Sequence, residues 1–380
     1  MMNRKVYTVV TALVLVFVLT ACSSSNNNGS ELDNNMPTDQ TLDNQPSTNQ
    51  PSDNQTSDIT YLFTANEGGS INKINVVTNE VTDTVEVDGS VHNVQLSPDG
   101  TILAVTVVPV MANEGAEADH DENAEDEHGH DGVVMNGFVQ FYEAANVKLV
   151  TTVEVGNHPA HVVYTSDGKN VLVTNNEGNN LMVINTSDYR VVQTIDTGKG
   201  PHGFRISADD KYAYIANMGE DTISVIDLVS MKESKRIRVG AAPVTTGVTK
   251  DGKTLAVTLN AENAMAIVDL STDKVEKIDV GIGPAQVYVQ ADGQYAYVAN
   301  QGTKENPSRT VTKIDLIDKK AVATIETGDG AHGLITSPDS KLLYVTNMFE
   351  DSLSVIDNEK NQVINTISTG VQPNGITITP

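Results

Sequence analysis

The sequence predicts an all-β protein, a seven-bladed β-propeller with four-stranded blades. Three observations lead to this prediction. A repeat of about forty residues runs through the chain, each repeat contains four short β-runs, and the two ends of the chain supply complementary parts of one repeat. Repeats of this length and strand content are typical of propellers, in which each blade packs only against its neighbours.

The repeat is clearest in residues 201–227 and 331–357, which read PHGFRISADDKYAYIANMGEDTISVID and AHGLITSPDSKLLYVTNMFEDSLSVID. Each copy contains a β-run that ends in Asn or an equivalent residue. The seven end positions are Asn66, Val107, Asn175, Asn217, Leu259, Asn300 and Asn347. Most intervals are 41 or 42 residues, but 68 residues separate Val107 from Asn175, which indicates an insertion there.

Within one unit, the runs FRIS, YAYIAN, ISVID and ESKRIRVG place β-branched and aromatic residues between Gly, Asp and Asn turns, a pattern that predicts strands. The C-terminal run GITITP supplies only the innermost strand of a unit, whereas the N-terminal run ITYLFTAN begins at the second strand. We therefore expect the two terminal strands to pair and complete one blade, which leaves no open sheet edge.

These motifs resemble the YVTN-repeat family of bacterial and archaeal extracytoplasmic propellers, and the resemblance covers residues 59–380. It implies the propeller fold and a location outside the cytoplasm. It does not imply one function, because propellers serve many roles.

Residues 1–21 are predicted to be a lipoprotein signal peptide. Arg4 and Lys5 precede an apolar run that is too short to span a membrane comfortably. The run ends in Leu-Thr-Ala-Cys22, which resembles the lipobox of bacterial lipoproteins. The resemblance implies acylation of Cys22, the only cysteine, and anchoring to the bacterial cell membrane by acyl chains alone. The alternative is an ordinary secretory peptide.

Residues 22–58, which begin with the acylated cysteine, are rich in Asn, Ser, Asp, Gln, Thr and Pro. This segment has almost nothing to bury, so we expect a disordered tether. The formal net charge of the chain is −26, which argues against a nucleic-acid partner or docking on anionic lipid and favours cations or basic surfaces.

The insertion, at about residues 109–132, concentrates this charge. Residues 112–132 read ANEGAEADHDENAEDEHGHDG and contain nine carboxylates, three histidines and no Lys or Arg. The insertion separates the second and third strands of its blade, so we expect it on the same face as the links that enter the innermost strands. His92, His202 and His332 lie in such links, seven residues before a turn Asp, and His161 lies one position further along.

Imidazole and carboxylate groups bind zinc and copper. We therefore expect a divalent transition metal, zinc in first place and copper as the alternative, to bind a set of histidines at the channel mouth and in the loop. The predicted metal-binding residues are His92, His161, His202 and His332 at the mouth, and His120, His128 and His130 in the loop. The arrangement resembles extracytoplasmic zinc-chaperone propellers, which implies a metal-transport solute-binding protein as partner.

Other interpretations stay open. The histidines could cap turns, the loop could be only a solvated segment, and the protein could be a cell-surface interaction propeller without metal cargo. A lactonase-like or metal-dependent hydrolase is a further alternative. We expect no enzyme, since the sequence has no CxxCH, no catalytic cysteine and no Gly-x-Ser-x-Gly motif. We also expect a monomer.

Overall fold

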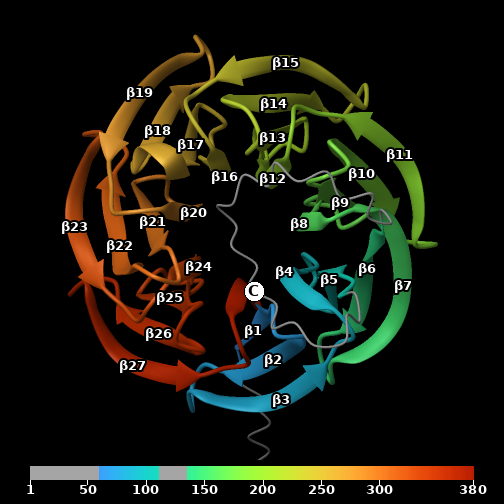
Figure 1. Ribbon diagram of the computed structural model, residues 1–380, viewed down its shortest axis with the longest axis horizontal. Helices are drawn as coiled ribbons and strands as arrows, with labels where there is room; N and C mark the ends of the chain where they lie inside the picture. The colour runs from blue at the N-terminus through green and yellow to red at the C-terminus, as the bar shows by residue number, and fades with distance from the viewer. Residues whose placement is uncertain (1–59, 111–134) are drawn as a thin grey trace, which may run out of the picture. The chain divides into compact units, whose positions relative to one another are not determined.

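The computed structural model describes residues 60–110 and 135–380. They form seven four-stranded antiparallel sheets arranged around a common centre (Figure 1). The prediction of a seven-bladed propeller is confirmed. The predicted signal peptide, Cys22, the tether and the three loop histidines lie outside the described residues. Within the described ranges, no helix has the length and hydropathy needed to cross a membrane.

We number the blades 1 to 7 in chain order and give their strands from the centre outward. The innermost strands are β28 (Pro373–Ile378), β4 (Ser90–Leu96), β8 (Pro159–Tyr164), β12 (Pro201–Ile206), β16 (Pro243–Val248), β20 (Pro284–Val289) and β24 (Ala331–Thr336). The second strands are β1 (Tyr61–Asn66), β5 (Ile102–Val108), β9 (Asn170–Asn175), β13 (Tyr212–Asn217), β17 (Thr254–Leu259), β21 (Tyr295–Gly302) and β25 (Leu342–Asn347).

The third strands are β2 (Ser70–Asn75), β6 (Asn136–Glu143), β10 (Asn180–Asn185), β14 (Thr222–Asp227), β18 (Ala264–Asp269), β22 (Pro307–Asp315) and β26 (Ser352–Asp357). The outermost strands are β3 (Glu80–Glu86), β7 (Lys148–Asn157), β11 (Arg190–Asp196), β15 (Lys232–Arg238), β19 (Lys274–Asp279), β23 (Lys320–Glu326) and β27 (Gln362–Ser368). A short 3-10 helix, η1 (Asn260–Glu262), follows β17.

Burial follows this order of strands. The second strands are almost entirely buried because a neighbouring blade covers each face, whereas most residues of the outermost strands are exposed. The apolar cores lie between adjacent blades: Phe204 of blade 4, for example, packs in one cluster with Leu172 and Leu181 of blade 3. Packing therefore joins each blade to its two neighbours.

The repeated asparagine at the end of the second strand is a structural residue. Asn175 accepts a hydrogen bond from the Gly156 backbone at 3.0 Å, and Asn347 accepts one from Gly328 at 3.2 Å. Both asparagines are fully buried. Each side chain thus holds the link that leads into the innermost strand, which explains why this marker recurs without a role in chemistry.

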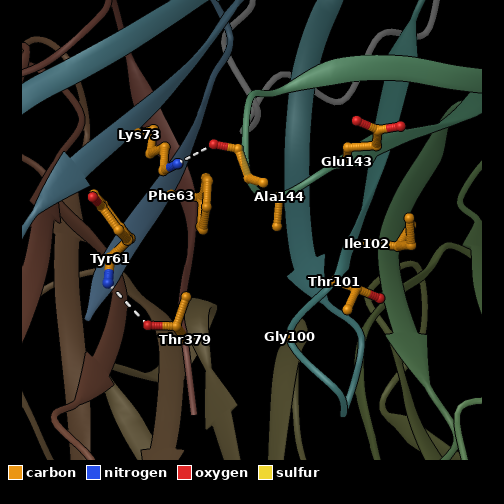
Figure 2. A pocket seen from close by; sticks show the side chains of 10 residues that line it. Tyr61, Phe63, Lys73, Gly100, Thr101, Ile102, Glu143, Ala144 and Thr379 are labelled. Carbon is orange, nitrogen blue, oxygen red and sulfur yellow. Dashed lines mark hydrogen bonds between the residues drawn. The ribbon is translucent and has the colours of Figure 1, made fainter. Parts of the chain in front are cut away.

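The two ends of the chain close the ring, as the sequence predicted. β28 pairs with β1 in antiparallel register, with Leu62 opposite Ile378. Beside this pair, Tyr61 N donates to Thr379 Oγ1 at 2.9 Å, at one end of a lateral pocket of about 390 Å³ between blades 1 and 2 (Figure 2). Lys73 of blade 1 donates across that pocket to the Ala145 carbonyl of blade 2 at 2.5 Å.

Candidate metal centre

Three histidines on the innermost strands of consecutive blades lie together. They are His92 on β4, His161 on β8 and His202 on β12, and one nitrogen of each ring lies within 4.8 Å of the others. Their exposed fractions are 4, 1 and 5 %. The ring centroids are 5.0 to 5.9 Å apart. We call this group the histidine triad.

Local strand geometry turns these side chains toward one another. The pairing of β12 with β13 is irregular between Pro201 and Phe204, and that of β8 with β9 is irregular between Pro159 and Val162. Regular alternation of faces is therefore lost over the two residues that follow each proline. For this reason His202, one residue after the proline of β12, and His161, two residues after the proline of β8, can both face the triad.

The glycine after His202 is required by packing. A Cβ at Gly203 would lie 2.3 Å from Thr245 Cγ2 on the neighbouring strand β16. Blades 4 and 5 thus approach too closely for any side chain there, which gives the Pro-His-Gly motif a structural origin beside any chemical one.

The outer nitrogens of two triad members have fixed partners. His92 Nδ1 lies 2.8 Å from Glu67 Oε1, and His202 Nδ1 lies 3.3 Å from the Val244 carbonyl oxygen. Both acceptors require a proton on Nδ1, so we assign the Nδ1-H tautomer to both rings. Each ring then presents the lone pair of Nε2, and the two Nε2 atoms are 3.3 Å apart.

This separation fits a shared cation. Zinc–nitrogen bonds of about 2.0–2.1 Å in a tetrahedral site place neighbouring nitrogens about 3.3–3.4 Å apart. Two lone pairs at this distance repel each other unless a proton or a cation lies between them. The contact of His92 with a carboxylate is also the arrangement that orients metal-binding histidines in proteins.

Glu67 is held in place from a second side. Asn374 Nδ2 on β28 donates to the same Oε1 atom at 2.6 Å. Burial raises the pKa of Glu67, but the contacts with His92 and Asn374 outweigh burial, and the pKa lies below its usual value. Glu67 is therefore ionised at neutral pH and supports the proton on His92 Nδ1.

His161 differs from the other two members because neither ring nitrogen has a hydrogen-bond partner among the described residues. An unsatisfied polar group in a buried position costs about 1–3 kcal/mol. Burial, followed by the charges of His202, His92 and Arg205, places the pKa of His161 well below its usual value. The ring is therefore neutral at pH 7, and the nitrogen that does not carry the proton is available as a ligand.

The fourth predicted mouth histidine lies apart from the triad. His332 is on β24 of blade 7, where its Nδ1 lies 3.3 Å from Gln286 Nε2 and its ring also hydrogen-bonds the Asn374 backbone. Burial lowers the pKa of His332 to about 4. Three of the four predicted mouth histidines therefore converge, whereas the ring of His332 contacts protein groups on both sides. Metal binding by these residues stays a prediction.

The sequence analysis missed the partners of the triad. Glu67 directly follows the marker Asn66, but residues of other types follow the other markers, so its position in the repeat did not indicate a contact with a histidine. Asn374 had a clearer signal, since Pro-Asn-Gly at 373–375 repeats Pro-His-Gly with Asn in place of His. A further histidine, His158, directly precedes β8; its side chain is 41 % exposed, and its Nδ1 lies 3.3 Å from Glu177 Oε1.

Comparison with known proteins places the fold in a family. A model of the YNCE-like β-propeller family matches residues 139–294 and 206–380, more than half of the chain. The chain belongs to the YNCE-like β-propeller family. Two triad members, His161 and His202, lie within the residues that match the YNCE-like family model, and His92 lies before them. Comparison with curated proteins gave no match.

Solved structures share the propeller fold at low sequence identity. A functionally unknown protein from Desulfotomaculum acetoxidans is 14 % identical, with a TM-score of 0.66 over 84 % of this chain and 98 % of that one. Hydrazine synthase from Kuenenia stuttgartiensis is 21 % identical, with 0.61 over 75 and 88 %. The dihydro-heme d1 dehydrogenase NirN is 15 % identical, with 0.58 over 83 and 74 %. At these identities the likeness concerns the fold alone, so enzymes among them do not decide whether this YNCE-like protein is one.

Proposed function

We propose that this protein binds one divalent transition-metal ion, zinc in first place, through His92, His161 and His202. The observation that carries the proposal is the 3.3 Å separation of two Nε2 atoms whose rings already donate through Nδ1. His161 completes the set, because its nitrogens have no other partner among the described residues. Histidines that only cap turns would have their ring nitrogens satisfied by protein groups, as His332 has.

We infer that the bound ion is cargo and is not needed to stabilise the fold. Seven apolar clusters join the blades and β28 closes the ring, so the described fold is held together without an ion. A lipid anchor at Cys22 would hold the protein outside the cytoplasm, and the acidic insertion would concentrate cations near the membrane. Together these features favour a metal chaperone that exchanges its ion with a solute-binding protein of a metal transporter.

Three neutral nitrogen ligands with a further coordination position are also the composition of catalytic zinc sites. A metal-dependent hydrolase is therefore the second candidate. Zinc-dependent hydrolysis of a lactone or ester by the parent, lost in His161→Ala, would favour it over a chaperone.

The test is a zinc titration of the full chain, with metal content measured by elemental analysis. We expect one tight ion per chain in the parent, and an affinity lower by more than about 100-fold in His161→Ala, since a ligand contributes more than the 10–100-fold of an outer partner. His332→Ala is the matched control, because it removes a buried histidine from an innermost strand outside the triad. Equal zinc affinity in the parent and His161→Ala would contradict the proposal.

The insertion calls for a separate variant. Deleting residues 112–131 should remove weak cation binding and slow metal capture, most strongly at low salt, because charges in solution are screened over about 8 Å at physiological ionic strength. The tight ion should remain. Loss of the tight ion on deletion would assign the binding site to the insertion instead.

A further inference from the structure

The seven innermost strands differ in charge from the rest of the molecule. They contain no Asp, Glu or Lys, and the only Lys or Arg side chain on them is Arg205 on β12. The whole chain, by contrast, has 50 acidic and 24 basic residues. The innermost strands therefore carry one fixed positive charge and no fixed negative charge, and the ionised Glu67 contacts them beside His92.

Arg205 is also the exception among the arginines that the structure describes. The other four each lie within 4.0 Å of a carboxylate: they are Arg190, Arg236, Arg238 and Arg309. Arg205 is half-buried, and within the described residues its guanidinium makes one hydrogen bond, from Nη1 to the Phe204 carbonyl at 2.8 Å. Four of its five N–H donors are left for other partners.

This position is unfavourable for an isolated cation. Removing a guanidinium from water without a counter-charge is costly, and burial lowers the pKa of Arg205, while Tyr288 raises it. The nearest carboxylate to the triad, Glu67, already accepts hydrogen bonds from His92 and Asn374. Within residues 60–110 and 135–380, no carboxylate thus pairs with Arg205.

Arg205 and the triad share one region. Arg205 follows His202 by three residues on β12, so their Cα atoms are at most about 10 Å apart. The charge of Arg205 also acts on His161. A divalent ion on the triad would add two positive charges close to Arg205, and the pair would attract an anion more strongly than either does alone.

We propose that the centre of the propeller binds a small oxyanion, a carboxylate or a tetrahedral phosphate-like group, between Arg205 and the metal on the histidine triad. The planar guanidinium donates to two oxygens of such a group, which a lysine cannot reproduce. The anion supplies the ligand that the three histidines leave open. This inference rests on the proposed metal site for its metal-bound form, but the proposed contact with Arg205 does not require the metal.

The test uses the full chain, metal-free and loaded with one zinc per chain, titrated calorimetrically with sodium phosphate, sulfate and acetate at constant ionic strength. We expect one anion per chain, bound about 5- to 150-fold more tightly when zinc is present, because coupled sites differ by this range. A preference for acetate or for phosphate identifies the class of oxyanion. Absence of anion binding in both forms of the parent overturns the inference.

Two variants locate the anion. Arg205→Met should abolish anion binding while retaining one zinc per chain, and Arg205→Lys should bind anions more weakly than the parent and more tightly than Arg205→Met. Arg238→Met, which removes an exposed and acid-paired arginine, is the matched control and should behave as the parent. Unchanged anion binding in Arg205→Met contradicts the assignment. If zinc does not bind the parent, the proposed metal site fails, and the metal-free titrations still decide on Arg205.

Discussion

Blade 4 and blade 7 have the same motif at the same place, yet their histidines have different surroundings. His202 and His332 are each the second residue of an innermost strand, and each precedes a glycine. His202 faces two further histidines from blades 2 and 3, whereas His332 contacts Gln286 and Asn374 from blades 6 and 1. The repeat thus fixes where a histidine lies, and the adjacent blades determine whether it can bind a metal.

Outside the three ligands themselves, the largest expected effect concerns the carboxylate behind the triad. Glu67→Gln removes the negative charge that holds the proton on His92 Nδ1, and we expect zinc affinity to fall about 10- to 100-fold. Titration calorimetry measures it. Glu177→Gln, which alters the carboxylate beside the exposed His158, is the control and should leave affinity unchanged. A similar loss in both variants would mean that only the overall charge matters.

The stability of the metal-free protein should show the opposite ranking of the two kinds of histidine. His332→Leu leaves Gln286 without its buried partner, so we expect the free energy of unfolding to fall by about 1–3 kcal/mol. His161→Leu removes two unsatisfied nitrogens, so stability should stay equal or rise. Urea denaturation of the metal-free variants measures both. A larger loss in His161→Leu would show that its ring has a structural partner.

The same residues show which features of the fold and the site could be predicted from the sequence. The order of strands, the closure of blade 1 and the presence of His92, His161, His202 and His332 near the innermost strands follow from the repeat, because a repeat places equivalent residues at equivalent points. The division into a triad and a separate His332 did not follow. It depends on strand irregularities after the prolines and on contacts between blades, which local patterns do not contain.

Arg205 illustrates the same limit. The sequence shows an arginine in the run FRIS, but the absence of a carboxylate beside it among the described residues depends on how the innermost strands come together. Glu67 and His92 are 25 residues apart, and Asn374 contacts both from the far end of the chain. The predictions for Cys22, His120, His128 and His130 concern residues outside the described ranges and remain predictions.

The pH dependence of stability tests the burial of His332 in blade 7. The pKa of His332 is about 4 in the folded protein, below the usual 6.5, so the unfolded chain binds the extra proton. Stability is therefore lost as pH falls from about 6.5 toward 4, by up to about 1.4 kcal/mol per pH unit for this residue. His332→Leu should reduce that slope in metal-free protein. Identical slopes for parent and variant would mean that His332 titrates normally.

The smallest effect is expected at the residue before the proline. His158 has a φ of 51°, at a position where blade 4 has Gly200 and blade 5 has Ala242, also with positive φ. Because glycine adopts this region without strain but loses more entropy on folding, His158→Gly should change stability by at most about 1 kcal/mol. Ala242→Gly is the control in thermal unfolding. Since His158 lies outside the triad, zinc affinity should not change, and a loss confined to His158→Gly would add it to the site.

The central claim is that three imidazole nitrogens on neighbouring blades hold one ion. X-ray absorption spectroscopy of the zinc-loaded full chain tests it most directly. We predict three nitrogen neighbours with imidazole scattering at about 2.0–2.1 Å and one further light ligand. A first shell made only of oxygen, without imidazole scattering, would show that zinc binds the acidic groups and would contradict the account.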